Sequence, residues 1–257
     1  MSVQTTTGDG VLTVTLDRPE KLNAFDSAMA HGLRNALEIA AHDDAIRVVL
    51  LAANGRAFCA GQDLADPDIA PGKDLGEHLE RHYNPLIRAM RALPKPIVAR
   101  VNGVAAGAGA NLAFAADIAI AARSASFIES FAKIGLLPDS GGTWMLPRLI
   151  GAARAGAIAL LGEKMTAEQA QAWGAIWQVV DDEELDAACA RVVQTLAAAP
   201  ARALAAIKGA LQSSWSSDFD AALDRERELQ RMLGATDDYR EGVEAFSAKR
   251  RPVFRGR

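Results

Sequence analysis

Residues 101–117, which read VNGVAAGAGANLAFAAD, are the stretch that decides how this chain is organised. The short apolar run at 96–101 is β-branched and predicts a buried strand. Asn102-Gly103 ends it, and no bulky side chain follows until Leu112. This pattern predicts a helix whose first N–H groups lack intrahelical partners and lie at the positive end of the dipole. Such a start can donate to an oxygen that gains negative charge. Alternatively, small residues here only allow the helix to pack closely on the sheet.

The part of the chain before this stretch predicts a parallel βαβ unit. Residues 10–17 alternate apolar and polar side chains, and residues 46–53 are continuously apolar. Asp26 is a good N-cap for a helix between these strands. The order strand, helix, strand implies a parallel pair with a right-handed crossover, and therefore an α/β fold. Residues 54–63 (NGRAFCAGQD) are predicted as a loop at the carboxyl end of the second strand, where ligands bind in such sheets.

The part after this stretch predicts further short strands and then helices alone. Strands are expected at 118–122, 127–128 and 179–180, helices at 75–93 and 151–161, and a loop at 136–143 that enters a helix. Thr166 and Gln169 have the spacing of a capping box. From residue 185 the pattern is helical, with breaks at Pro200 and Gly234. We expect a core at 1–199 and a helical region at 200–257.

Composition excludes several classes of function. The net charge of -4 and the lack of a basic stripe argue against nucleic-acid binding. The N-terminus is polar, and no uncharged apolar run reaches the ~18 residues that span a bilayer. Cys59 and Cys189 lie far apart, which favours a reduced cytoplasmic setting. Cys59 has no histidine nearby in sequence, so a nucleophilic role is disfavoured. The four histidines are expected to be solvated, and no metal site is predicted.

Five motifs together resemble the crotonase (enoyl-CoA hydratase/isomerase) superfamily over nearly the whole chain. They are AFCAGQDL (57–64), VNGVAAGAGANLAFAADI (101–118), IGLLPDSGGTWMLPRLIG (134–151), TAEQAQAWG (166–174) and EAFSAKRRPVF (244–254). Within this superfamily, the chain is similar to the 1,2-epoxyphenylacetyl-CoA isomerases. The likeness rests on Asp139 together with GQDL (61–64), the TW that follows SGG (143–144) and AWGAIWQVVDD (172–182). The resemblance implies a spiral of ββα units that binds acyl-CoA, and a C-terminal helical region that forms a homotrimer or a hexamer.

The resemblance also implies site residues. The N–H groups of Gln62 and Ala108 would form an oxyanion hole for the thioester carbonyl. The family usually has glycine at the second place, but alanine keeps the N–H. Other positions would contact the CoA or the acyl group, with Phe246 and Lys249 reaching the CoA, in one arrangement from a neighbouring subunit. The full set of these binding positions is Lys21, Asn23, Ala24, Ala60, Asp63, Leu64, Gly107, Asn111, Phe131, Phe246 and Lys249.

The departures from the hydratase pattern favour an isomerase. Enoyl-CoA hydratases use two glutamates, and matching by position places them at Asn111 and Phe131, which take up no proton. We therefore expect weak or absent hydratase activity. Asp139 remains, at a place where isomerases of the superfamily carry a single acid, although an aspartate before a helix start is also a common N-cap. Glu129 is a second candidate, expected to face solvent or to pair with an arginine.

These features predict an isomerase of acyl-CoA thioesters. The expected reaction converts ring-1,2-epoxyphenylacetyl-CoA to oxepin-CoA in aerobic phenylacetate catabolism. The alternatives are a Δ3,Δ2-enoyl-CoA isomerase of fatty-acid type and a non-catalytic acyl-CoA-binding homologue. No metal or cofactor is implied beyond the coenzyme A of the substrate.

Overall fold

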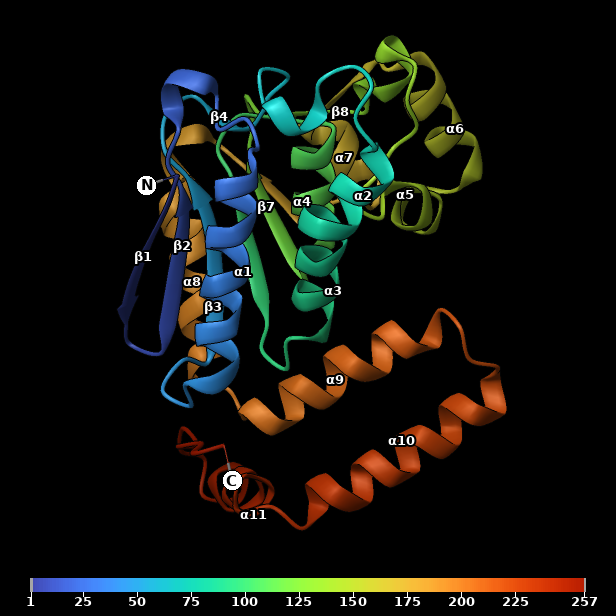
Figure 1. Cartoon of the computed structure of the whole chain (residues 1–257). Coiled ribbons are helices and arrows are strands. Elements are labelled where there is room, and N and C mark those ends of the chain that lie inside the picture. Colours follow the sequence, from blue (N-terminus) through green and yellow to red (C-terminus); the bar gives the residue numbers. More distant parts are fainter. Residues whose placement is uncertain (1, 257) are drawn as a thin grey trace.

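A computed structural model describes residues 2–256, and its framework is a six-stranded sheet (Figure 1). The strand order is β1-β2-β3-β5-β7-β10, and all neighbours are parallel except β1 and β2. The apolar runs β3 and β5 lie in its interior. The strands are β1 (Val3–Gly8), β2 (Val11–Leu16), β3 (Val48–Ala53), β5 (Ile97–Val101), β7 (Ile118–Ala122) and β10 (Gln178–Val180).

A second sheet of four short strands stands beside the first. In it β4 (Ala57–Cys59), β6 (Val104–Ala106) and β8 (Ser126–Ile128) are parallel neighbours, and β9 (Lys164–Thr166) pairs antiparallel with β8. The chain passes from the large sheet to the small one at β3–β4, at β5–β6 and at β7–β8. Helices follow each of these pairs, so the predicted spiral of ββα units is confirmed.

The helices begin where the sequence signals predict. Asp26 caps α1 (Ser27–His42), and its Oδ1 accepts from the Met29 N–H at 2.7 Å. The expected helix at 75–93 consists of α2 (Leu75–His78), a π-helical turn η3 (Leu79–Tyr83) and α3 (Asn84–Ala92). Helix α4 (Ala108–Ala115) is buried on all sides. The predicted capping box at Thr166 and Gln169 is present. The helices that follow α4 in the core are α5 (Gly142–Ile150), α6 (Ala152–Leu161), α7 (Ala167–Trp173) and α8 (Leu185–Ala198).

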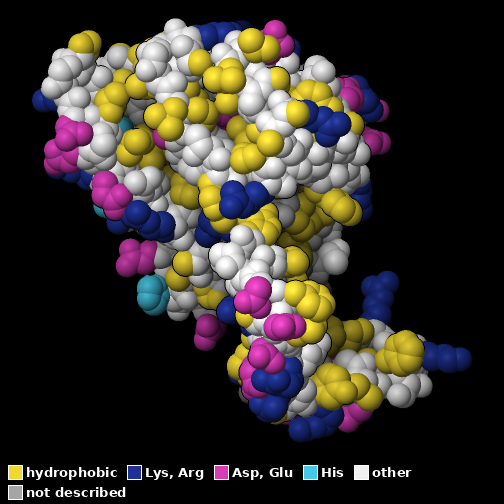
Figure 2. Space-filling model, turned by 90° about the vertical axis from the view of Figure 1, so that its right-hand side faces the viewer, with side chains coloured by type: hydrophobic (Ala, Val, Ile, Leu, Met, Phe, Trp, Pro, Cys, Tyr) yellow, Lys and Arg dark blue, Asp and Glu magenta, His cyan; other side chains and the backbone are white. Residues whose placement is uncertain are grey.

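Three C-terminal helices form an arm that stands away from the sheets (Figures 1 and 2). They are α9 (Ala201–Ser214), α10 (Phe219–Gly234) and α11 (Asp237–Ser247). The buried Lys208 of α9 anchors the arm to the body, because its Nζ lies 2.8 Å from Asp117 Oδ2 and donates to the Met90 carbonyl. Within residues 2–256, no helix has the length and apolar character needed to span a membrane.

Several local predictions were wrong. The stretch 54–63 is not only a loop, since β4 lies within it, and strands β1, β6 and β9 had no prediction. Strands β4, β6 and β9 have three residues each, which is too short for a periodic signal, and only pairing with neighbours holds them in extended form. Strand β1 has six residues, but they are mostly polar and exposed and show no apolar alternation. The histidines were expected to be solvated, but His78 is 7% exposed. Its burial comes from tertiary packing around η3, which the local polar sequence does not reveal.

Candidate functional site

The site lies at the carboxyl edge of the parallel strands of the small sheet. Cys59 of β4 pairs with Ala105 of β6. Gln62 comes three residues after Cys59, and Ala108 comes three residues after Ala105. Ala106 of β6 pairs with Ile128 of β8, and Glu129 follows directly. Strand register therefore places both proposed N–H donors and a carboxylate at the same edge.

Two glycines allow the loops that carry the donors to approach closely. Gly61 has φ +90°, and a Cβ there would lie 2.8 Å from the Ala106 carbonyl oxygen. A Cβ on Gly109 would lie 2.3 Å from the Cys59 carbonyl oxygen. Both distances are shorter than any side chain tolerates, so only glycine permits this contact between the β4 loop and the start of α4.

The two predicted donor groups are free. Ala108 is the first residue of α4, after Gly107 at φ +52° as the N-cap, so its N–H has no intrahelical partner. Gln62 forms a bridge with Phe25, but the bonds of that bridge use the N–H groups of Phe25 and Asp63. Among the described residues, nothing accepts a hydrogen bond from Gln62 N–H or Ala108 N–H. The pair can therefore serve an incoming oxygen, at the positive end of the α4 dipole.

The side chain of Gln62 is held in place by a hydrogen bond from a buried tyrosine. Its Oε1 accepts a hydrogen bond from the hydroxyl of Tyr83, which is 3% exposed. Burial raises the pKa of Tyr83 well above its usual range, and the nearby charge of Asp139 adds to the effect. The hydroxyl therefore stays a neutral donor, and Asp139 lies near the Tyr83–Gln62 pair.

Asp139 does not cap a helix. Helix α5 begins at Gly142 with Gly141 as its N-cap, and among residues 2–256 the Asp139 carboxylate accepts only from the hydroxyl of Ser140, at 2.8 Å. Its backbone carbonyl accepts from Asn111 Nδ2 at 3.0 Å, which ties it to α4. Burial raises the pKa of Asp139, partly offset by the Ser140 bond. The capping alternative is thereby excluded, and a base with a raised pKa remains.

Glu129 contradicts its prediction, because it neither faces solvent nor pairs with an arginine. It is 1% exposed, its Oε2 accepts from Asn111 Nδ2 at 3.4 Å, and Oε1 has no hydrogen-bond partner in the part of the chain that the structure describes. Burial raises the pKa of Glu129 to about 8; the Asn111 bond lowers it, and the Asp139 charge raises it. No signal in the sequence identifies its burial, which depends on packing by α4 and by the loop before α5. Glu129 was expected to face solvent or to pair with an arginine because it lies on a short strand.

Two of the positions expected to contact the substrate, Asn111 and Phe131, are buried. Phe131 is 7% exposed and lies against Gly107, where a Cβ would be 3.5 Å from the phenyl ring. Asn111 is fully buried, and the start of α5 at Gly142 packs on its amide. Cys59 is buried, and burial raises the pKa of its thiol to about 12, so it is no nucleophile at neutral pH.

Of the positions expected to contact CoA, the structure brings only some together, around Asp63. Asn23 is buried, and its amide donates to the carbonyls of Asn54 and Ala57, so its side chain holds the loops together. Asp63 pairs with Arg18 at 2.9 Å. Next to Asp63 lies an open cavity of about 430 Å³, lined by Arg18, Asp26, Ser27, Ala28 and residues 65–68. Ala24 is buried, Ala60 is half-buried, and Lys21 and Leu64 are exposed.

Phe246 and Lys249 lie outside this group. Phe246 is 87% exposed and Lys249 is exposed, both at the α11 end of the arm. In Figure 1 this end of the arm lies below the sheets, whereas the carboxyl ends of the parallel strands point upward. Within one chain the structure does not bring these two residues to the site.

Comparison with known proteins gives a consistent picture. The enoyl-CoA hydratase/isomerase family model matches residues 6–257. The 1,2-epoxyphenylacetyl-CoA isomerase of Escherichia coli is 53% identical over 251 residues, which cover 96% of each chain. The trans-2-decenoyl-[acyl-carrier-protein] isomerase of Streptococcus mutans is 38% identical over 97% of this chain and 96% of its own. The crystal structure of an enoyl-CoA hydratase from Mycobacterium smegmatis matches with a TM-score of 0.93, at 32% identity over 99% of each chain.

Proposed function

Because this chain belongs to the enoyl-CoA hydratase/isomerase family, we propose that it is an acyl-CoA isomerase that acts on ring-1,2-epoxyphenylacetyl-CoA. The observation that carries the proposal is Asp139. It is a half-buried carboxylate with no capping role, near Tyr83, whose hydroxyl binds Gln62. An isomerase needs a group that removes a proton from one carbon and returns it to another, and a carboxylate with a raised pKa suits that exchange.

The two free N–H groups supply the second element of the mechanism. In the bound substrate the thioester oxygen accepts from Gln62 N–H and Ala108 N–H. These bonds strengthen as negative charge builds on the oxygen, so they lower the energy of the enolate-like transition state. For a 3-enoyl-CoA, Asp139 takes a proton from C2 and the proton returns at C4, which moves the double bond from position 3 to position 2.

For the ring epoxide the same polarisation assists opening of the three-membered ring and rearrangement to the seven-membered oxepin. Glu129 adds an acid to this site, because a carboxyl with a pKa of about 8 is largely protonated at neutral pH. Protonated, it is a hydrogen-bond donor to oxygen. The apolar side chain of Phe131 suits an aromatic or partly unsaturated ring.

The same residues argue against efficient hydration. A hydratase must hold a water and move its proton, and at the two positions matched to the hydratase glutamates this chain has Asn111 and Phe131. An amide and a phenyl ring accept no proton at neutral pH. We therefore infer that addition of water to a 2-enoyl-CoA is slow compared with isomerisation.

The second candidate function is a Δ3,Δ2-enoyl-CoA isomerase for linear chains. It is favoured by the likeness to the streptococcal isomerase, whose name specifies a decenoyl chain. The third, a non-catalytic acyl-CoA-binding protein, predicts CoA binding without turnover.

Product analysis with three substrates separates these functions. The purified protein is incubated with ring-1,2-epoxyphenylacetyl-CoA, a linear 3-enoyl-CoA and a linear 2-enoyl-CoA, and products are identified by mass and ultraviolet spectrum. Oxepin formation faster than double-bond migration supports the proposal, and the reverse order favours the linear-chain isomerase. Rapid hydration of the 2-enoyl-CoA contradicts the inference from Asn111 and Phe131.

The role of Asp139 is tested by Asp139→Asn, which keeps the shape and removes the base. We expect kcat for double-bond migration to fall about 10²–10⁴-fold, the usual contribution of general acid–base catalysis. CoA binding, measured by calorimetry, should persist. A folded variant with full isomerase activity would show that Asp139 is not the base.

A further inference from the structure

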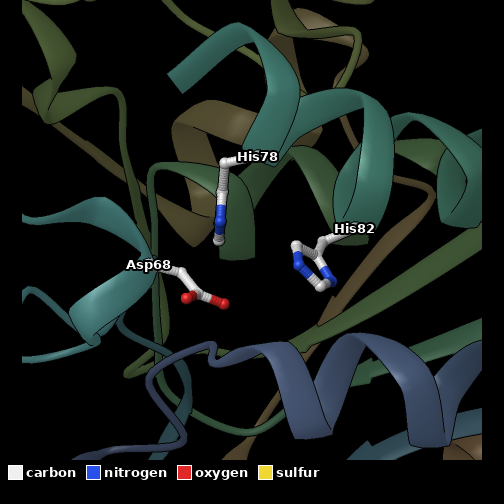
Figure 3. Close-up of side chains that lie close together, drawn as sticks. All are labelled: Asp68, His78 and His82. Carbon is white, nitrogen blue, oxygen red and sulfur yellow. The ribbon is translucent and has the colours of Figure 1, made fainter. Parts of the chain in front are cut away.

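The loop and helix next to the site bring together three side chains with the chemistry of a metal site. They are Asp68, which follows β4 in the short 3-10 turn η2 (Pro67–Ile69), His78 at the end of α2, and His82 in η3. One ligand atom from each lies within 4.8 Å of the other two. Figure 3 shows the three side chains converging on one space between the loop and the helix.

His78 is the observation that points to a ligand. Its side chain is 93% buried, as the 7% exposure implies, and neither ring nitrogen has a hydrogen-bond partner among the described residues. A buried imidazole without partners loses the hydrogen bonds it makes to water, which is unfavourable. A bound cation would satisfy one of those nitrogens.

The other two side chains lie on the open side of the same space. Asp68 is exposed and His82 half-buried, and the His78 and His82 rings have centroids 4.8 Å apart. The hydroxyl of Ser27 connects them: it donates to Asp68 Oδ2 at 3.1 Å and lies 3.4 Å from His82 Nε2. The three residues line a cavity of about 180 Å³, together with Lys73, Asp74, Glu77 and Arg81.

We propose that Asp68, His78 and His82 bind a divalent transition-metal ion of the Zn²⁺ class. Two imidazoles and one carboxylate suit Zn²⁺ and Co²⁺, whereas Mg²⁺ and Ca²⁺ prefer oxygen ligands alone. A tetrahedral Zn²⁺ at about 2.0–2.1 Å from each nitrogen holds its ligand atoms about 3.3 Å apart. The side chains of Asp68 and His82 can close that distance by rotation, because neither is enclosed. Water takes the fourth position.

The charges around the cavity permit a cation. The lining carries three carboxylates, Asp68, Asp74 and Glu77, against Lys73 and Arg81. Glu77 and Arg81 form an ion pair with each other, so they contribute little net field. Bound there, the ion connects η2 to η3, which ends at Tyr83, the residue that holds Gln62.

Metal binding to the full-length, tag-free chain tests this proposal. After treatment with a chelator, the protein is titrated with Zn²⁺ by calorimetry, and with Co²⁺ while the visible absorption is recorded. We expect one ion per chain, visible Co²⁺ bands of a four-coordinate site, and a rise of Tm on Zn²⁺ addition. Absence of saturable binding of either ion would overturn the proposal.

Variants locate the ion. Asp68→Asn and His82→Ala should weaken Zn²⁺ binding at least tenfold, and His78→Ala should do so more strongly. His31→Ala is the control, because His31 is an exposed histidine of α1 whose ring lies within hydrogen-bond distance of Asn35, and the Zn²⁺ affinity of this variant should equal that of the unmodified chain. If the variant of the buried His78 fails to fold, Asp68→Asn and His82→Ala still test whether the ion binds at this site. Unchanged affinity in both would place the ion elsewhere and refute the site.

Discussion

At the scale of single residues, Ala108 offers a direct test of a backbone donor. It occupies the first position of α4, where proline is well tolerated because that N–H takes part in no helical bond. Ala108→Pro therefore deletes one of the two proposed oxyanion donors with little effect on the helix. We expect kcat to fall about 10²–10³-fold, as for removal of one such donor elsewhere. Steady-state kinetics on the best isomerase substrate measures it.

Ala152→Pro is the matched control. Ala152 is exposed and is the first residue of α6, and it also follows a glycine with positive φ, Gly151 at +79°. Both alanines start a helix after a glycine with positive φ, although ψ is -125° at Gly107 and 156° at Gly151, and the Ala152 variant should keep its kcat. Equal losses in the two variants would mean that proline disturbs the fold generally, and an unaffected Ala108 variant would remove this N–H from the mechanism.

Glu129 makes folding stability depend on pH. Its pKa is about 8 in the folded protein, above the usual 4.5, so the folded state holds a proton that the unfolded state has released between these values. The free energy of unfolding therefore falls as pH rises through that window, by up to about 1.4 kcal/mol per pH unit, and levels off above pH 8. Below pH 4.5 both states are protonated and the effect vanishes.

Glu129→Gln removes this proton linkage. Relative to the unmodified chain, the variant should gain stability as pH rises from 5 to 8, by up to about 4 kcal/mol, because its neutral amide has no proton to release. Urea unfolding of both proteins at several pH values measures the difference. A difference that stays constant over this range would show that Glu129 is ionised in the folded protein.

At the scale of elements, the sequence predicts helices far better than the small sheet. Asp26 and the Thr166–Gln169 pair carry capping signals within a few residues, and both helices begin there. The strands β4, β6 and β9 have three residues each, and they are extended only because neighbours pair with them. No local pattern specifies such a strand, since its stabilisation comes from residues distant in sequence.

The candidate site also combines residues that a local motif identifies with residues whose position depends on tertiary packing. Asp139 and the loops that carry Gln62 and Ala108 could be located from motifs. The burial of Glu129 could not, because it depends on α4 and on the loop before α5 packing over it. His78 escaped prediction for the same reason: no local pattern marks it as buried, and its burial arises from packing with His82 and Tyr83.

An ion pair between Lys208 of the arm and Asp117 of the body anchors the arm. Lys208 of α9 is buried and its partner Asp117 is mostly buried, so removing the lysine leaves a carboxylate without its counter-charge. Lys208→Ala should lower the free energy of unfolding by about 3 kcal/mol, the usual cost of breaking a buried pair from one side. Arg202→Ala on the exposed face of the same helix should change it by less than about 0.5 kcal/mol. Chemical unfolding of both variants decides.

At the scale of the whole molecule, the arm exposes more large apolar side chains than a free surface favours. Phe219 is 75% exposed and Phe246 87%, and Figure 2 shows further hydrophobic side chains along the arm. Patches of this kind mark interaction surfaces. We therefore propose that copies of this chain pack through their arms into a trimer or a hexamer.

Light scattering after size exclusion tests this assembly. We expect a mass three or six times that of one chain, and a smaller mass for Phe219→Asp, which places a charge on the apolar face of α10. Glu226→Lys, an exposed change on the same helix, controls for altered charge. A single-chain mass for the unmodified protein at micromolar concentration would contradict the assembly and leave Phe246 and Lys249 without a site to serve.

The free N–H groups at 62 and 108 have a consequence for how related chains are compared. Both belong to the main chain, and both are positioned by the pairing of β4 with β6. Every amino acid except proline carries the same N–H, so residue identity at these two positions says almost nothing about whether a relative can polarise a thioester. The informative positions are Gly61 and Gly109, the glycines that let the two loops approach closely. Chemistry can then diverge at Asn111, Phe131 and Asp139 while the polarising groups persist unchanged.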